Sequence, residues 1–176
     1  MKFLVFKFLV IFLYLTTTSL SYSIERPDIK NIVINKDKKS YKNVVFKDIN
    51  NQELNLDNFA NRLIIINFWA TWCVPCRKEM PLLDLLQSNK RLHNLIVLPI
   101  NVGGGDILKL KIFFKELNIK NLDIYFDPTV NLANKFLLRG LPTTILINKE
   151  GQEFARILGY IDFESKKFIN WLENFN

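Results

Sequence analysis

The sequence predicts an α/β fold in which a central mixed sheet carries helices on both faces. Two observations support this prediction. Apolar runs typical of buried strands alternate with segments of helical periodicity, and a strand–turn–strand pattern follows them before a final helix. The length of 176 residues, with 49% hydrophobic and 23% charged residues, fits a single globular domain.

The strongest strand signal is the run Leu63–Phe68, which is apolar at nearly every position. Such runs are typical of central parallel strands that are covered on both faces. A second run, Leu95–Ile100, predicts another buried strand with Pro99 near its end. Short strands are expected at Val44–Phe46 and around Leu54.

Helices are predicted between and after these strands. The first runs from about Cys73 to Ser88. The second is capped by Asp106 and has an apolar face at helical spacing: Ile107, Leu110, Phe114 and Leu117. Asp127 and Pro128 together predict a short helix that reaches about Leu138.

A β-hairpin and a last helix complete the pattern. The strands Thr143–Ile147 and Phe154–Leu158 are separated by the turn residues 148–151. We expect Asp162 to cap the last helix, whose apolar face consists of Phe168, Leu172 and Phe175.

Residues 1–23 have the three-part pattern of a secretory signal peptide. Lys2 and Lys7 give a positive start, Phe8–Leu15 is apolar, and residues 16–23 are mostly small or polar. An uncleaved membrane anchor is the alternative, because the uncharged stretch reaches the lower length limit of a span. Either reading predicts an exported, periplasmic protein, in an oxidising compartment where paired cysteines rest as a disulfide.

The rest of the chain divides into two parts. Residues 24–43 are polar and rich in Lys and Asn, and we interpret them as a linker with at most one edge strand. Residues 44–176 form the predicted domain. The net charge of +7 is spread along the chain without a basic stripe, which argues against nucleic-acid binding. Two cysteines and the single His93 are too few for a zinc site, and we expect neither a metal nor a cofactor.

The two cysteines lie at the junction between the first buried strand and the helix after it. Cys73 and Cys76 are three residues apart, so they share a helix face and can form a disulfide. The unpaired N–H groups of the helix start favour a thiolate, and Arg77 and Lys78 add positive charge. Pro75 stiffens the first turn. A structural disulfide is the alternative, but so small a loop stabilises a fold little.

Position suggests a role for each group. Cys73 lies at the helix start and is expected to be the more exposed thiol, so it would attack a substrate disulfide; Cys76 would resolve the mixed disulfide. Glu79 lies one turn beyond Cys76 and could exchange a proton with it, unless its carboxylate is simply exposed. We expect Trp72 to shield the thiols.

The strings NFWATWCVPC (67–76), RKEMP (77–81) and RGLPTT (139–144) resemble the thioredoxin-like family, and within it the TlpA-like group of periplasmic reductases. The resemblance covers residues 44–174. It implies a thioredoxin-like fold, a cis peptide bond between Leu141 and Pro142 packed against the cysteines, and a functional position for Glu79. Cytosolic thioredoxins carry a buried Asp where this chain has Asn67, which we expect to be a hydrogen-bonded core residue.

The resemblance also implies contacts with a substrate. A cis bond would direct the Leu141 backbone at a bound substrate strand, and Trp72, Val74 and Pro75 would contact it beside the disulfide. Pro142 joins the two cysteines and Glu79 as a candidate catalytic residue.

These features favour a thiol–disulfide oxidoreductase that acts as a periplasmic reductase. Its partners would be exported protein thiols that await haem or copper, such as apocytochrome c or copper-site proteins, and a membrane electron donor. A general disulfide oxidase or isomerase is one alternative. A Cu(I)-binding chaperone is another, since Cu(I) prefers soft thiolate ligands.

Overall fold

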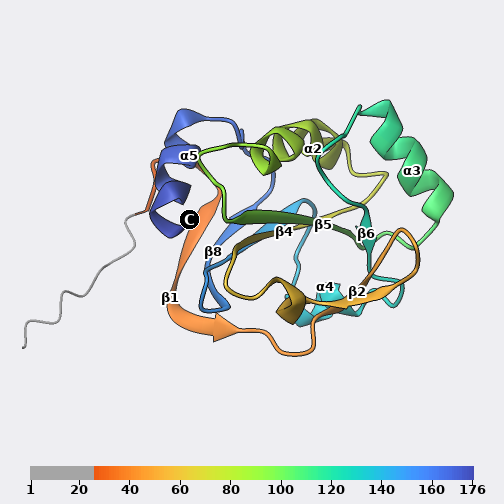
Figure 1. The fold of residues 1–176 in the computed structure, drawn as a ribbon, viewed down its shortest axis with the longest axis horizontal. Coiled ribbons are helices and arrows are strands. Elements are labelled where there is room, and N and C mark those ends of the chain that lie inside the picture. The colour runs from red at the N-terminus through yellow and green to blue at the C-terminus, as the bar shows by residue number, and fades with distance from the viewer. Residues whose placement is uncertain (1–25) are drawn as a thin grey trace, which may run out of the picture.

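The computed structural model describes residues 26–176, which contain one eight-stranded mixed sheet (Figure 1). Its strands occur in the spatial order β1-β8-β7-β4-β5-β6-β2-β3. Only the β4–β5 and β5–β6 pairs are parallel. The strands are β1 (Ile32–Ser40), β2 (Val45–Asp48), β3 (Glu53–Asn55), β4 (Leu63–Trp69), β5 (Leu95–Asn101), β6 (Tyr125–Phe126), β7 (Thr143–Ile147) and β8 (Gln152–Leu158).

Helices cover both faces of the sheet, as predicted. In Figure 1, α2, α3 and α5 lie on one side of the central strands and α4 on the other. The α-helices are α2 (Val74–Gln87), α3 (Ile107–Glu116), α4 (Asn131–Lys135) and α5 (Lys166–Leu172). Two short 3-10 helices are η1 (Leu56–Phe59) and η2 (Glu173–Phe175).

Strand β4 is the centre of the core, and all seven of its residues are buried. Its side chains alternate between two apolar clusters, as the two-residue period of a strand requires. Leu63, Ile65 and Trp69 join the cluster that includes buried residues of α2, α3 and α5. Ile64, Ile66 and Phe68 join the cluster that includes α4 and η1.

Two helix starts differ from the prediction. Helix α4 begins at Asn131, because the carboxylate of Asp127 accepts hydrogen bonds from the backbone of Thr129 and Leu132 and closes a turn first. Val130 then adopts a left-handed conformation, with φ of 56°. Helix α5 is capped by Ser165, while Asp162 accepts a hydrogen bond from the backbone of Glu164 in the preceding turn.

Strand β1 shows how residues 32–40 join the sheet. It pairs antiparallel with β8 at the sheet edge, and Ile32 is fully buried opposite Ile157. The predicted signal peptide or anchor, residues 1–23, lies outside the described residues. Of the helices within residues 26–176, none has the length and apolar character needed to cross a membrane.

Candidate active site

The cysteine pair lies where β4 ends and α2 begins, at the carboxyl edge of the parallel strands. Cys73 is the N-cap of α2 and forms a disulfide with Cys76, with Cα atoms 5.3 Å apart. The Cys73 sulfur also accepts a hydrogen bond from the Cys76 backbone N–H at 3.3 Å. The sulfur therefore occupies the place where the helix start offers unpaired N–H groups, and these stabilise a thiolate once the disulfide is reduced.

Both cysteines are largely buried in the disulfide form. Cys73 is 4% exposed and Cys76 is fully buried. Cys73 is therefore the more exposed of the two, as predicted, but the difference is small. The reason is packing, because both side chains belong to the apolar cluster that contains Trp69. The residues on either side are open: Trp72 is 71% and Val74 is 67% exposed. A protein that reached Cys73 would therefore meet an apolar rim.

Glu79 points into the protein from the second turn of α2 and is fully buried, which excludes an exposed helix carboxylate. Burial raises the pKa of its carboxyl to about 8, although a hydrogen bond from Asn67 opposes this. That bond joins Asn67 Nδ2 to Glu79 Oε1 at 2.7 Å. Glu79 thus holds a proton at neutral pH and can release it near pH 8, close to Cys76 on the same helix face.

Arg77, which was expected from the sequence to add positive charge beside the cysteines, interacts with α3. Its guanidinium forms an ion pair with Glu116 of α3 at 2.5 Å and lies over the ring of Phe113. Its charge is therefore partly neutralised. Lys78, the other neighbouring cation, is exposed to solvent, which screens its charge.

The peptide bond between Leu141 and Pro142 is cis. It leads directly into β7, whose first residue, Thr143, pairs with Phe68 near the end of β4. The Leu141 side chain packs against both apolar clusters. Within residues 26–176, no hydrogen-bond partner is found for the backbone of Leu141, whereas the Pro142 carbonyl accepts one from Gly159 N–H at 2.9 Å.

Two residues near the site were not among those predicted for it, and Gly103 was interpreted from the sequence as part of a plain turn. Thr144 is fully buried, and its hydroxyl accepts a hydrogen bond from Asn67 at 2.9 Å. Gly103 packs so closely that an added Cβ would lie 3.0 Å from Ala70 Cβ and 3.5 Å from Trp72 Nε1. The position of Gly103, two residues after the end of β5, was the signal in the sequence that could have indicated this close packing.

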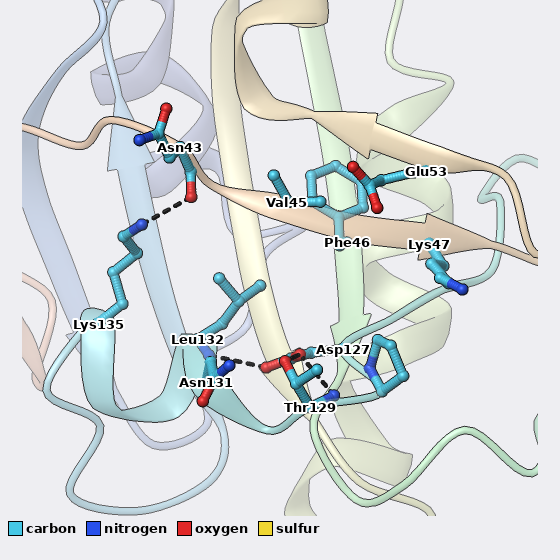
Figure 2. A pocket seen from close by; sticks show the side chains of 11 residues that line it. Asn43, Val45, Phe46, Lys47, Glu53, Asp127, Thr129, Asn131, Leu132 and Lys135 are labelled. Carbon is cyan, nitrogen blue, oxygen red and sulfur yellow. Dashed lines mark hydrogen bonds between the residues drawn. The ribbon is translucent and has the colours of Figure 1, made fainter.

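Residues 26–176 contain no group of three or more His, Cys, Asp or Glu side chains able to hold a metal ion. His93 is exposed. A separate cavity of about 570 Å³ lies between β2 and the segment leading into α4 (Figure 2). None of the residues predicted for the site lines it, and its Asp127 carboxylate is already hydrogen-bonded to Thr129 and Leu132.

The sequence profile of the AhpC/TSA family matches residues 38–152, which include β4, α2, the cis bond and β7. The chain belongs to this family. Among curated relatives, "Thiol-disulfide oxidoreductase ResA" of Bacillus subtilis is 29% identical over 117 residues, covering 66% of this chain and 64% of that protein. The protein of the same name from Geobacillus kaustophilus is 31% identical over 115 residues, covering 65% of each chain. The matches thus span just under two thirds of these relatives.

Solved structures show the same fold. A putative thiol:disulfide interchange protein DsbE from Chlorobium tepidum superposes with a TM-score of 0.65 at 22% identity, covering 78% of this chain and 97% of that one. A secreted thiol-disulfide isomerase from Corynebacterium glutamicum gives 0.69 at 20% identity, covering 87% and 98%. The thioredoxin-like fold and the relationship to the TlpA-like group predicted from the sequence are confirmed.

Proposed function

We propose that this member of the AhpC/TSA family is a thiol–disulfide oxidoreductase that works through Cys73 and Cys76. The observation that carries the proposal is the disulfide at the start of α2 with the buried carboxyl of Glu79 one turn behind it. A structural disulfide would require neither the helix start nor a buried titratable neighbour. Curated relatives named as thiol-disulfide oxidoreductases support the same reading.

In the proposed reaction, reduced Cys73 attacks a client disulfide as the thiolate. A mixed disulfide forms between Cys73 and one client sulfur, and the other client sulfur leaves as a thiolate and takes up a proton. In the fraction of molecules whose Glu79 is ionised, which grows as the pH approaches 8, Cys76 then gives its proton to the Glu79 carboxylate and attacks the Cys73 sulfur. The second client sulfur leaves, so two electrons pass to the client and the Cys73–Cys76 disulfide is restored.

The client would bind across the open surface beside the disulfide. Its backbone would pair with the Leu141 backbone, which has no partner within the described residues, in the manner of an added strand. Trp72 and Val74 would cover apolar side chains around the client cysteine, since both are mostly exposed. Pro75 and Pro142 would border the same contact.

We propose the reducing direction from the charges around the cysteines. A strongly oxidising pair requires a strongly stabilised thiolate. Here the charge of Arg77 is partly neutralised by Glu116, and Glu79, which is mostly neutral at pH 7, supplies no positive charge that would stabilise a thiolate. The helix start is left as the main stabilising influence, which favours a reducing couple supplied with electrons by a membrane donor.

The clients and compartment in this proposal come from the resemblance to TlpA-like reductases. They are exported proteins whose cysteines must stay reduced until haem or copper is attached, as in cytochrome c or cytochrome oxidase maturation. The protein would act in the periplasm, either free or held by an N-terminal anchor.

The test is the reduction potential of the Cys73–Cys76 couple, measured by equilibration with glutathione and with a stronger dithiol at pH 7. We expect a value towards the roughly −270 mV of thioredoxin. A value near the roughly −120 mV of a strong oxidant would reverse the direction of electron flow and identify a disulfide-forming protein instead. Tight binding of Cu(I) to the reduced protein, without exchange activity, would favour the copper chaperone.

A further inference from the structure

A chain of three buried side chains links the sheet to the helix behind the cysteines. Asn67 comes from β4, Glu79 from α2 and Thr144 from β7, and each is fully buried. The Asn67 amide nitrogen donates to Glu79 Oε1 at 2.7 Å and to Thr144 Oγ1 at 2.9 Å. An amide nitrogen has two N–H groups, so both are used.

This arrangement fixes which carboxyl oxygen of Glu79 is available for chemistry. Oε1 is occupied by the Asn67 N–H, whereas Oε2 is buried and has no hydrogen-bond partner among the described residues. A proton on the carboxyl therefore resides on Oε2. If the Asn67 amide turned, Oε1 would lose its donor and the two oxygens would no longer differ.

Thr144 is what keeps the amide from turning. The two residues are directly opposite each other in the antiparallel β4–β7 pair, so the threonine hydroxyl faces the amide across the ladder. Asn67 Oδ1 has no partner of its own, so the two N–H bonds alone define the orientation of the amide. Without the hydroxyl, only the bond to Glu79 would remain.

We propose that Thr144 and Asn67 are positioning residues that hold Glu79 with Oε2 as the oxygen that exchanges a proton with Cys76. This inference rests on the proposed function. The balanced step starts from ionised Glu79. The Cys76 thiol proton moves to the free Oε2, the bond between the Cys76 and Cys73 sulfurs forms, and the bond from Cys73 to the client breaks, so that the client sulfur leaves with the electron pair.

The position of Thr144 also ties proton transfer to the proposed client surface. It lies two residues after Pro142 on the strand that starts at the cis bond. The same short segment therefore presents the Leu141 backbone to a client and holds the proton acceptor in place. A displacement of this segment would change the position of Glu79 through only two hydrogen bonds, from Thr144 to Asn67 and from Asn67 to Glu79.

Two causes act on the pKa of Glu79 in the oxidised protein: burial, which raises it, and the Asn67 hydrogen bond, which lowers it. The titratable groups that share its helix face are Cys73 and Cys76, joined as the disulfide, while Arg77 pairs with Glu116 and Lys78 is exposed. Loosening the Asn67 bond should therefore raise this pKa further.

The test compares Thr144→Val, which removes the hydroxyl at nearly constant volume, with Thr144→Ser, which keeps it. Thr143→Val is the matched control, because it removes a threonine hydroxyl on the same strand that donates to Gly140 O on the other face of the sheet. The oxidised full-length chain is labelled with ¹³C at glutamate carboxyl carbons, and the Glu79 signal is identified by its loss in Glu79→Gln.

We expect the pKa of Glu79 to rise by about one pH unit in Thr144→Val, to return towards the wild-type value in Thr144→Ser, and to stay unchanged in Thr143→Val. In the reduced protein, the pH profile of the reaction with oxidised glutathione should shift in the same direction. Thr144→Ala serves as a second variant without the hydroxyl if Thr144→Val does not fold.

An unchanged Glu79 pKa in both variants that lack the hydroxyl, with a loss of stability like that of Thr143→Val, would overturn the proposal and leave Thr144 a packing residue. The pKa is read without turnover. An inactive wild-type protein would therefore refute the proposed function separately from the positioning of Glu79.

Discussion

Glu79 is the residue at which the needs of stability and of chemistry oppose each other. Its carboxyl is fully buried, and its pKa rises from an ordinary value of 4.5 to about 8 in the folded protein. Between these two values the folded state binds more protons than the unfolded state. The stabilisation by this proton is complete below pH 4.5 and is lost as the pH rises through 8.

We therefore expect Glu79→Gln to remove a pH dependence as well as a proton acceptor. Each unit of raised pKa corresponds to about 1.4 kcal/mol, so the free energy of unfolding of the wild type should fall relative to the variant by roughly 3–4 kcal/mol between pH 5 and pH 9. Urea unfolding of both oxidised proteins across this range measures it. Parallel curves would mean that the carboxyl is not buried in solution.

At this scale the sequence predicted the positions of the site residues better than their contacts. The placement of Cys73, Cys76 and Glu79 along one helix face follows from helical spacing, which is local and readable along the chain. The partners of Asn67 and Arg77 cannot be predicted in this way. Thr144 is 77 residues from Asn67, and Glu116 is 39 residues from Arg77. Such pairs depend on strand register and helix packing, which no local pattern encodes.

At the scale of elements, one buried carboxylate holds α2 to the loop that follows α3. Asp84 is 7% exposed, and its Oδ1 accepts three backbone N–H bonds at 3.0, 2.6 and 3.1 Å, from Lys120, Asn121 and Leu122. Its Oδ2 also accepts from the Asn121 side chain at 3.0 Å. These bonds fix the far part of the helix that carries the cysteines at its start.

Asp84→Ala should lower the free energy of unfolding by roughly 2–4 kcal/mol, because it leaves buried N–H groups without an acceptor. The reduction potential of the cysteine pair should stay the same, since the helix start is untouched. Asp57→Ala is the control, because Asp57 is exposed in η1. It should lower the free energy of unfolding by much less than Asp84→Ala does. A changed potential in Asp84→Ala would mean that the loop after α3 also tunes the thiols.

The type and order of the main elements were predictable, but the starts of α4 and α5 and the end of α4 were not. Asp106 caps α3 as expected, with its side chain accepting from Lys109 N–H. Asp127 has the same signature before a proline, yet its carboxylate closes a turn at Thr129 and the helix starts later. An aspartate can cap a turn or a helix with similar bonds, so composition alone does not separate the two outcomes.

At the scale of the whole molecule, a partly buried polar network joins distant parts of the chain. Arg156 on β8 donates to Glu153, to the hydroxyl of Tyr41 and to the backbone carbonyl of Phe136 after α4. Burial raises the pKa of the Glu153 carboxyl, but hydrogen bonds from Arg156 and Tyr41 outweigh this and leave it lowered. The network ties the segment between β1 and β2 to the sheet face that carries α4.

Strand β1 and the residues around it bear on where the folded unit starts. The sequence suggested a linker with at most one edge strand before residue 44, and the family match begins at residue 38. In the structure, β1 pairs with β8, its residue Ile32 is fully buried, and the next residue, Val33, is 47% exposed. Neighbouring residues on one strand thus face the core and the solvent, which provides a matched pair for measurement.

If β1 belongs to the cooperative unit, Ile32→Ala should lower the free energy of unfolding by roughly 2–4 kcal/mol, the usual cost of a cavity at a well-packed site. Val33→Ala should cost well under 1 kcal/mol, because little apolar area is lost there. Urea unfolding midpoints of the full-length oxidised variants give both values, provided that the dependence of the unfolding free energy on urea concentration is the same in each variant. Equal and small costs would mean that residues 24–43 act as the linker suggested by the sequence; a large cost at Ile32 alone would extend the folded unit to β1, beyond the region matched by the family.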